Sequence, residues 1–216
     1  MKNDFFFVKS MEGDFHTKTL KGKRKVNFQS VQNILDTKTI HLNTKSFGQK
    51  SRLSTTILSA NYLKTYRSQG IIFQTSLHPS YILPFDIVLL SDVKKIIVHY
   101  YRIKDNLHFY YNHQLLPGYK KFIFNNFHEL VKKLPSHSVI WKDVNMFRKQ
   151  AGFKRLPASK KRLIEYNEAV FEKSVKIVPI AIFGYNKEAR RLAKEYKLPH
   201  FRTAKDFYTK TVLKKE

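Results

Sequence analysis

The residues with the clearest chemistry are seven basic side chains within fifteen positions, in the segment 148–162 (RKQAGFKRLPASKKR). Residues 144–164 contain no acid, so nothing in this stretch offsets the charge. Cations at this density bind phosphates, and each contact releases counterions. Gly152 and Pro157 interrupt the segment, which predicts a phosphate-binding loop or a pair of turns; the alternative is a solvated charged face. The predicted contacts are Arg148, Lys149, Lys154, Arg155, Lys160, Lys161 and Arg162.

A second basic cluster falls within the first fifty residues, where hydrophobic periodicity is weak. We expect residues 1–50 to form a basic extension that orders on meeting nucleic acid. Residues 205–216 include the lysine pair Lys214 and Lys215 near their end and are expected to form a basic tail. This leaves 51–204 as the nucleic-acid-binding core. The predicted contacts in the extension are Lys21, Lys23, Arg24 and Lys25.

The balance of charge points to a polyanionic partner. The 216-residue chain carries 41 Lys and Arg against 16 Asp and Glu, a formal charge of +25. Such self-repulsion is best tolerated when a polyanion neutralises it, so nucleic acid is the expected partner. No apolar run is long enough to span a bilayer, and the first residues do not form a signal peptide, so we expect no membrane partner and no secretion. The many Lys, Phe, Tyr and Asn residues are typical of an AT-rich gene, which favours the cytoplasm or an organelle matrix such as that of mitochondria.

Several catalytic classes are excluded by what the sequence lacks. The chain has no Cys, which removes disulfide scaffolds, iron–sulfur clusters, thiolate zinc sites and Cys nucleophiles. It has no Walker loop, GxGxxG, GxSxG or HExxH. His99, His108 and His113 lie close in sequence, but proximity alone does not supply the converging ligands of a metal site. We therefore predict no metal site and no cofactor.

The spacing of apolar residues predicts the elements that carry these side chains. A 3.6-residue pattern predicts a helix over 51–69, and β-rich runs predict strands over 71–76, 84–90, 95–103 and 107–111. The last three runs are closely spaced, which favours an antiparallel meander. These elements form the first half of the predicted core.

The second half reads as alternating helices and strands. Asn126 and Glu129 have capping-box spacing for a helix that ends before Pro135. Helices are predicted over 159–174 and 186–197, with strands over 175–183 and 198–202. This order favours parallel pairing of the strands through a helical crossover. The fold class is therefore a single α/β domain, with an α+β tendency, in which helices flank a mixed sheet.

The elements over 51–69, 71–76, 84–88 and 96–101 resemble the core of PD-(D/E)XK nucleases, which include restriction endonucleases and Holliday-junction resolvases. The resemblance covers roughly residues 48–135. It implies a strand Asp followed, one strand later, by a Glu-x-Lys motif. In that family the carboxylates bind magnesium, which activates water, and the Lys positions that water.

Asp86 matches the family's strand Asp, whereas the Glu position falls on His99 and the Lys position on Tyr101. One carboxylate does not hold magnesium tightly, and a neutral imidazole is a poor ligand for it. The resemblance therefore implies a degenerate, non-catalytic site, with Asp86, His99 and Tyr101 as the catalytic candidates if the chain is a nuclease.

Two functions remain as hypotheses, with a peripheral membrane protein as a weaker third. The first is a non-catalytic RNA-binding component of a ribonucleoprotein, such as a ribosome, contacting RNA and other proteins of that assembly. RNA is preferred to DNA because basic extensions around a compact core suit large RNA assemblies. The second is a magnesium-dependent endonuclease of the PD-(D/E)XK type, acting on DNA or RNA.

Overall fold

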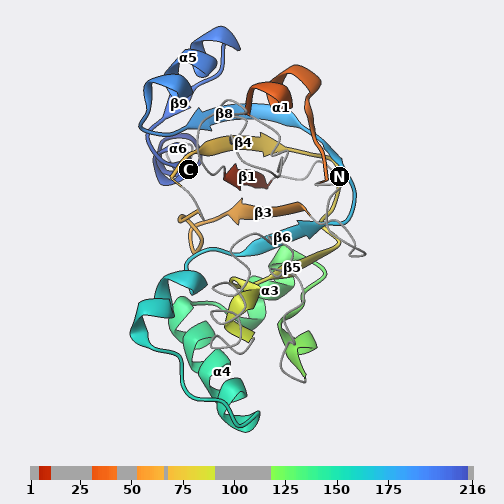
Figure 1. Ribbon diagram of the computed structural model, residues 1–216, viewed down its shortest axis with the longest axis vertical. Coiled ribbons are helices and arrows are strands. Elements are labelled where there is room, and N and C mark those ends of the chain that lie inside the picture. Colours follow the sequence, from red (N-terminus) through yellow and green to blue (C-terminus); the bar gives the residue numbers. More distant parts are fainter. Residues whose placement is uncertain (1–4, 11–30, 43–52, 66–67, 91–117, 214–216) are drawn as a thin grey trace, which may run out of the picture.

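The computed structural model describes residues 5–10, 31–42, 53–65, 68–90 and 118–213. In this part of the chain, seven strands form one sheet in the order β5-β6-β3-β1-β4-β8-β9 (Figure 1). Within it β8 and β9 run parallel, and the other neighbours are antiparallel. The strands are β1 (Phe6–Ser10), β3 (Leu53–Leu58), β4 (Gly70–Gln74), β5 (Tyr81–Leu83), β6 (Glu168–Phe171), β8 (Val178–Phe183) and β9 (His200–Phe201). This mixed sheet with flanking helices confirms the predicted α/β domain.

Helices lie toward both ends of the sheet. In Figure 1, α3 and α4 lie toward one end of the long axis, and α5 lies at the other. A two-stranded pair, β2 (Thr39–Ile40) with β7 (Val175–Lys176), flanks the sheet. The α-helices are α1 (Val31–Thr37), α3 (Phe127–Lys133), α4 (His137–Gln150), α5 (Lys187–Glu195) and α6 (Ala204–Thr211), and the 3-10 helices are η1 (Ile87–Leu90), η3 (Tyr119–Phe122) and η4 (Ala158–Ile164).

Strand β1 lies at the centre of the sheet, between β3 and β4. Phe7 enters the larger core on one face, and Val8 enters the smaller core on the other. Burial of apolar side chains on both faces of the sheet stabilises β1, although the hydrophobic periodicity of the first fifty residues is weak. The prediction that residues 1–50 form an extension is therefore wrong for β1, α1 and β2. The cluster Lys21, Lys23, Arg24 and Lys25 lies outside the described residues.

The predicted helix over 51–69 is wrong, because its first part is strand β3. Thr55, Thr56 and Ile57 are consecutive β-branched residues, which favour a strand over a helix. Apolar residues at a spacing of four also fit a strand when both faces are buried, as they are at Ile57 and Leu58. The predicted strand over 71–76 is confirmed as β4.

The predicted strand over 84–90 is also wrong, because β5 ends before Pro84 and η1 follows. Proline cannot donate to a strand ladder. Instead the Leu89 amide donates to the carbonyl oxygen of Asp86 at 3.0 Å, which closes the turn of η1. A short apolar run does not separate a buried strand from a buried helical turn. The predicted strands over 95–103 and 107–111 lie outside the described residues.

The segment 159–174 forms η4 and strand β6 instead of the predicted helix. Asn167 is fully buried and pairs with both backbone groups of Ile57, donating from Nδ2 at 2.8 Å and accepting at Oδ1 at 2.9 Å. This bidentate contact holds the start of β6 beside β3. Helix α4, which precedes this segment, was not predicted.

The last third of the chain largely follows its prediction. The strand over 175–183 appears as β7 and β8, and Asn186 caps α5 by accepting from the Ala189 amide at 2.8 Å. β9 then pairs in parallel with β8, as expected for a β-α-β unit. The predicted tail over 205–216 is wrong for α6. Phe207 of α6 is buried, with its ring centroid 5.0 Å from that of Phe6.

Candidate nucleic-acid interface

Helix α4 and the residues after it carry the basic segment. Ser136 caps the start of α4 by accepting from the Val139 amide, and Ile140, Val144 and Phe147 bury its apolar face. Both η1 and η4 pack against α4. The segment therefore begins in the last turn of a helix fixed to the core, where positive charge interacts favourably with the helix dipole.

The loop after α4 folds back onto the helix. The Phe153 amide donates to the Arg148 carbonyl at 2.8 Å, and the Leu156 amide donates to Oδ1 of Asn145 at 2.8 Å. Leu156 is buried, whereas Lys154 and Arg155 are exposed. These contacts hold two exposed cations beside the end of α4.

Helix η4 anchors the remaining cations of the segment. Leu163 and Ile164 are buried at its C-terminal end. Lys161 and Arg162 are exposed. The predicted loop is thus a rigid turn followed by a 3-10 helix, and both hold their cations against the protein body.

Arg148 differs from its neighbours, because only 5% of its surface is exposed. Its Nε donates to the Lys154 carbonyl at 3.1 Å, and its Nη1 donates to the Leu89 carbonyl at 3.0 Å. The guanidinium also lies 5.5 Å from the centroid of the Phe153 ring. These contacts tie the loop and η1 to α4, so Arg148 is structural and does not belong to the interface.

Two lysines that the sequence did not single out lie next to α4. Lys121 of η3 places its Nζ 4.5 Å from the ring centroid of Phe147 and 5.1 Å from that of Phe122. Lys120, its neighbour in η3, is exposed. The pair of lysines is visible in the sequence, but its position beside α4 depends on folding. We define the basic surface as Lys120, Lys121, Lys149, Lys154, Arg155, Lys160, Lys161 and Arg162.

Among the described residues, no acid forms an ion pair with a member of the basic surface. Glu165, the next acid after η4, instead pairs with Lys64 at 2.6 Å. The described acids therefore do not neutralise the positive field around the end of α4. Such a field attracts polyanions and speeds their association.

Asp86, the catalytic candidate, makes hydrogen bonds that join two elements of the fold. The Tyr166 hydroxyl donates to its Oδ2 at 2.7 Å, and its amide donates to the Leu163 carbonyl at 3.1 Å. It thereby joins η1 to the end of η4. His99 and Tyr101 lie outside the described residues. Within the described residues, no group of three His, Asp or Glu side chains is placed to hold a metal ion.

Two other polar clusters lie at the edge of the core. Lys9 donates from Nζ to the Ser54 carbonyl at 3.2 Å; burial lowers its pKa to about 8, and nearby Glu168 partly offsets this. In the second cluster, Tyr62 and His137 are in edge-to-face contact with ring centroids 5.5 Å apart. The Tyr62 hydroxyl and Nε2 of His137 are buried without a hydrogen-bond partner. Neither cluster contains a member of the basic surface.

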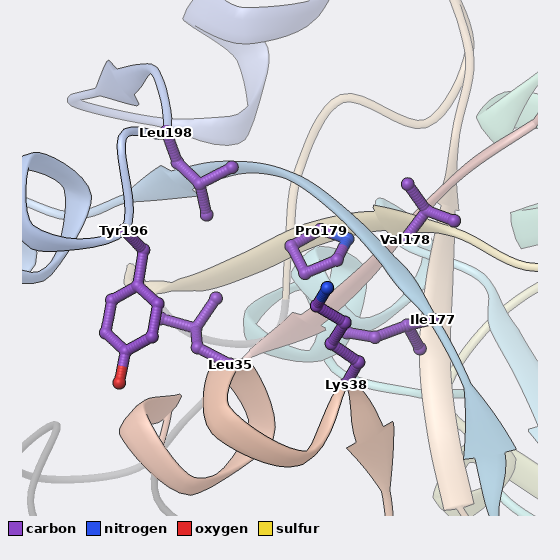
Figure 2. A pocket seen from close by; sticks show the side chains of 7 residues that line it. All are labelled: Leu35, Lys38, Ile177, Val178, Pro179, Tyr196 and Leu198. Carbon is purple, nitrogen blue, oxygen red and sulfur yellow. The ribbon is translucent and has the colours of Figure 1, made fainter.

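A shallow groove of about 350 Å³ lies where α1 faces the start of β8 (Figure 2). Its wall is mainly apolar, with Lys38 and Tyr196 at its edges. The Tyr196 hydroxyl donates to Asp36, and this bond is the main reason that the pKa of Tyr196 is raised to about 12. The groove suits an apolar group better than a phosphate. It is lined by Leu35, Lys38, Ile177, Val178, Pro179, Tyr196 and Leu198.

No helix in the described part of the chain is long and apolar enough to cross a membrane. The comparisons with known proteins add no relative. A scan against protein-family models gives no match, and searches of curated proteins and of solved structures give none either.

Proposed function

We propose that this protein binds nucleic acid through the basic surface, with RNA as the preferred ligand, as a non-catalytic component of a ribonucleoprotein such as a ribosome. The observation that carries the proposal is a set of cations around the end of α4 that are held in place and form no ion pair with an acid in the part of the chain that the structure describes. The overall charge of +25 supports it, because binding a polyanion relieves self-repulsion.

The position of the charges favours contacts with the phosphate backbone. A recognition helix in a helix-turn-helix reads bases with its N-terminal residues. In α4 the exposed cations are Lys142, in the middle of the helix, and Lys149, in its last turn; the other cations of the basic surface on this side follow in the loop and in η4. Cations on a turn and a 3-10 helix suit the irregular surface of folded RNA, which is recognised largely by shape.

The proposal has consequences for partners and location. A structural component of a ribonucleoprotein contacts other proteins of that assembly and needs no cofactor. We place it in the cytoplasm or in an organelle matrix such as that of mitochondria, where such assemblies occur.

Competition binding tests the preference for RNA. A labelled structured RNA is bound at near-physiological salt, and unlabelled RNA or a DNA duplex of the same length is added. We expect RNA to compete more strongly, and structured RNA to co-purify with the protein. Equal or stronger competition by the duplex would overturn the RNA assignment, and failure to bind either polymer at low salt would overturn the proposed function itself.

A further inference from the structure

The loop between β8 and α5 presents an aromatic ring to solvent. Tyr185 is 62% exposed, more than any other large hydrophobic or aromatic side chain in the described residues. An exposed tyrosine contributes little to folding, because burial is what makes an aromatic side chain stabilising. The ring is therefore free to contact a ligand.

The backbone on both sides of Tyr185 is fixed. The Gly184 amide donates to the Phe201 carbonyl at 3.0 Å, and the Gly184 carbonyl accepts from Nε2 of His200 at 2.9 Å. On the other side, Asn186 caps α5 and donates from Nδ2 to the side chain of Gln69 at 2.8 Å. A ring on a fixed backbone loses little conformational freedom on binding, which favours affinity.

Two exposed cations lie close to Tyr185 along the backbone. The parallel register pairs Phe183 with Phe201, and this register places Arg202 beside Gly184, one residue from Tyr185. Arg202 and Lys187 are exposed, and within the described residues neither forms an ion pair.

The nearby acids are engaged elsewhere. Glu188 pairs with Arg191 at 2.6 Å. Asp206 accepts from the Thr203 amide at 3.0 Å in the capping box of α6. The charge next to Tyr185 is therefore positive in the direction of Arg202 and Lys187.

We infer that Tyr185 is a stacking platform for an unpaired RNA base and that Arg202 contacts an adjoining phosphate. This inference rests on the proposed function and adds to it a second contact, just before the start of α5, the helix that lies at the opposite end of the long axis from α4 (Figure 1). Aromatic side chains bind single-stranded nucleic acid by stacking on base faces, while neighbouring cations follow the backbone.

Binding of a single-stranded RNA oligonucleotide tests the site, with a blunt RNA duplex as the comparison probe. Tyr185→Ala should weaken binding of the single strand about tenfold. Its salt slope should not change, because no phosphate contact is lost. Tyr185→Phe should bind like wild type, since the ring is kept. Val178→Ala, at a side chain that is 60% exposed, is the control for loss of an exposed apolar group.

The outcomes separate this inference from the proposed function. Tyr185→Ala with wild-type affinity for the single strand would overturn the stacking site, while salt-dependent binding by the same variant would leave the proposed function standing. An equal loss on the duplex would also overturn it, because paired bases do not offer an open face. Wild-type protein that binds neither probe at low salt would remove the proposed function, and the stacking site with it.

Discussion

Nη1 of Arg148 donates to the carbonyl oxygen of Leu89 at 3.0 Å, across 59 positions of sequence. The next residue, Lys149, is exposed. Two adjacent cations of one basic segment therefore have different roles. Arg148 holds η1 and the loop against α4, and Lys149 belongs to the basic surface.

Replacing Arg148 should change mainly the stability of the protein, and replacing Lys149 should change mainly its binding to RNA. Arg148→Gln should lower the free energy of unfolding by about 2–3 kcal/mol, because a charged donor to the buried Leu89 carbonyl and the partly buried Lys154 carbonyl is lost. Lys149→Gln should change it by less than about 0.5 kcal/mol. It should, however, reduce the salt slope of RNA binding by roughly one unit. Urea denaturation and a salt series measure the two effects. The reverse pattern would show that the assignment of roles is wrong.

Asp86 should matter for stability and not for catalysis. Asp86→Ala removes the acceptor of the Tyr166 hydroxyl and should cost about 1–2 kcal/mol, whereas Asp86→Asn keeps an acceptor and should cost less. We expect no cleavage of duplex DNA, branched DNA or structured RNA in magnesium or manganese. Cleavage by wild type that disappears in Asp86→Ala would restore the nuclease hypothesis.

Burial of His137 predicts a loss of stability in acid. Burial lowers the pKa of His137 below its usual value; nearby Glu165 and the Asn61 backbone oppose this shift, while Lys64 adds to it. As the pH falls below about 6.5, His137 is protonated in the unfolded chain before it is protonated in the folded chain. The free energy of unfolding therefore falls with pH until the folded state is also protonated. Denaturation midpoints at several pH values should show this decline, and His137→Gln should reduce it. The surface variant His78→Gln is the control and should keep the full decline. The same full decline in His137→Gln would contradict this role.

The buried hydroxyl of Tyr62 should be dispensable. Only 1% of Tyr62 is exposed, and its hydroxyl has no hydrogen-bond partner, a condition that costs about 1–3 kcal/mol. Tyr62→Phe keeps the ring contacts with Phe127 and His137 and should raise the free energy of unfolding by about 1 kcal/mol. A clear loss of stability in chemical denaturation would show that the hydroxyl is stabilising.

Local signals were sufficient for some elements and failed for others. Asn186 and the β-rich run before it predicted a cap and a strand, because both depend on neighbouring residues. The centre of the sheet could not be predicted in this way. β1 is defined by its pairing with β3 and β4, which come more than forty residues later. At 51–69, the apolar residues have helical spacing only because β3 buries side chains on both of its faces.

The candidate interface shows the same division. The charge of the segment 148–162 is visible in sequence, and most of its cations are exposed. Sequence does not distinguish Arg148 from Lys149, because the carbonyl oxygen of Leu89 reaches Arg148 only in the folded chain. Lys121 was missed for the same reason, since its contact with Phe147 joins two separate elements.

The salt dependence of RNA binding tests the central claim most directly. One variant replaces Lys149, Lys154, Arg155 and Lys161 of the basic surface with Gln. A matched control replaces four other exposed lysines, Lys173, Lys176, Lys194 and Lys197, so both variants lose the same charge.

For the basic-surface variant, we predict that the slope of log affinity against log salt falls by roughly three units, at about 0.7–0.9 per lost phosphate contact. The control should lose far less. Equal slopes in the two variants would contradict a defined interface at the end of α4 and would leave only the general attraction of a basic protein for a polyanion.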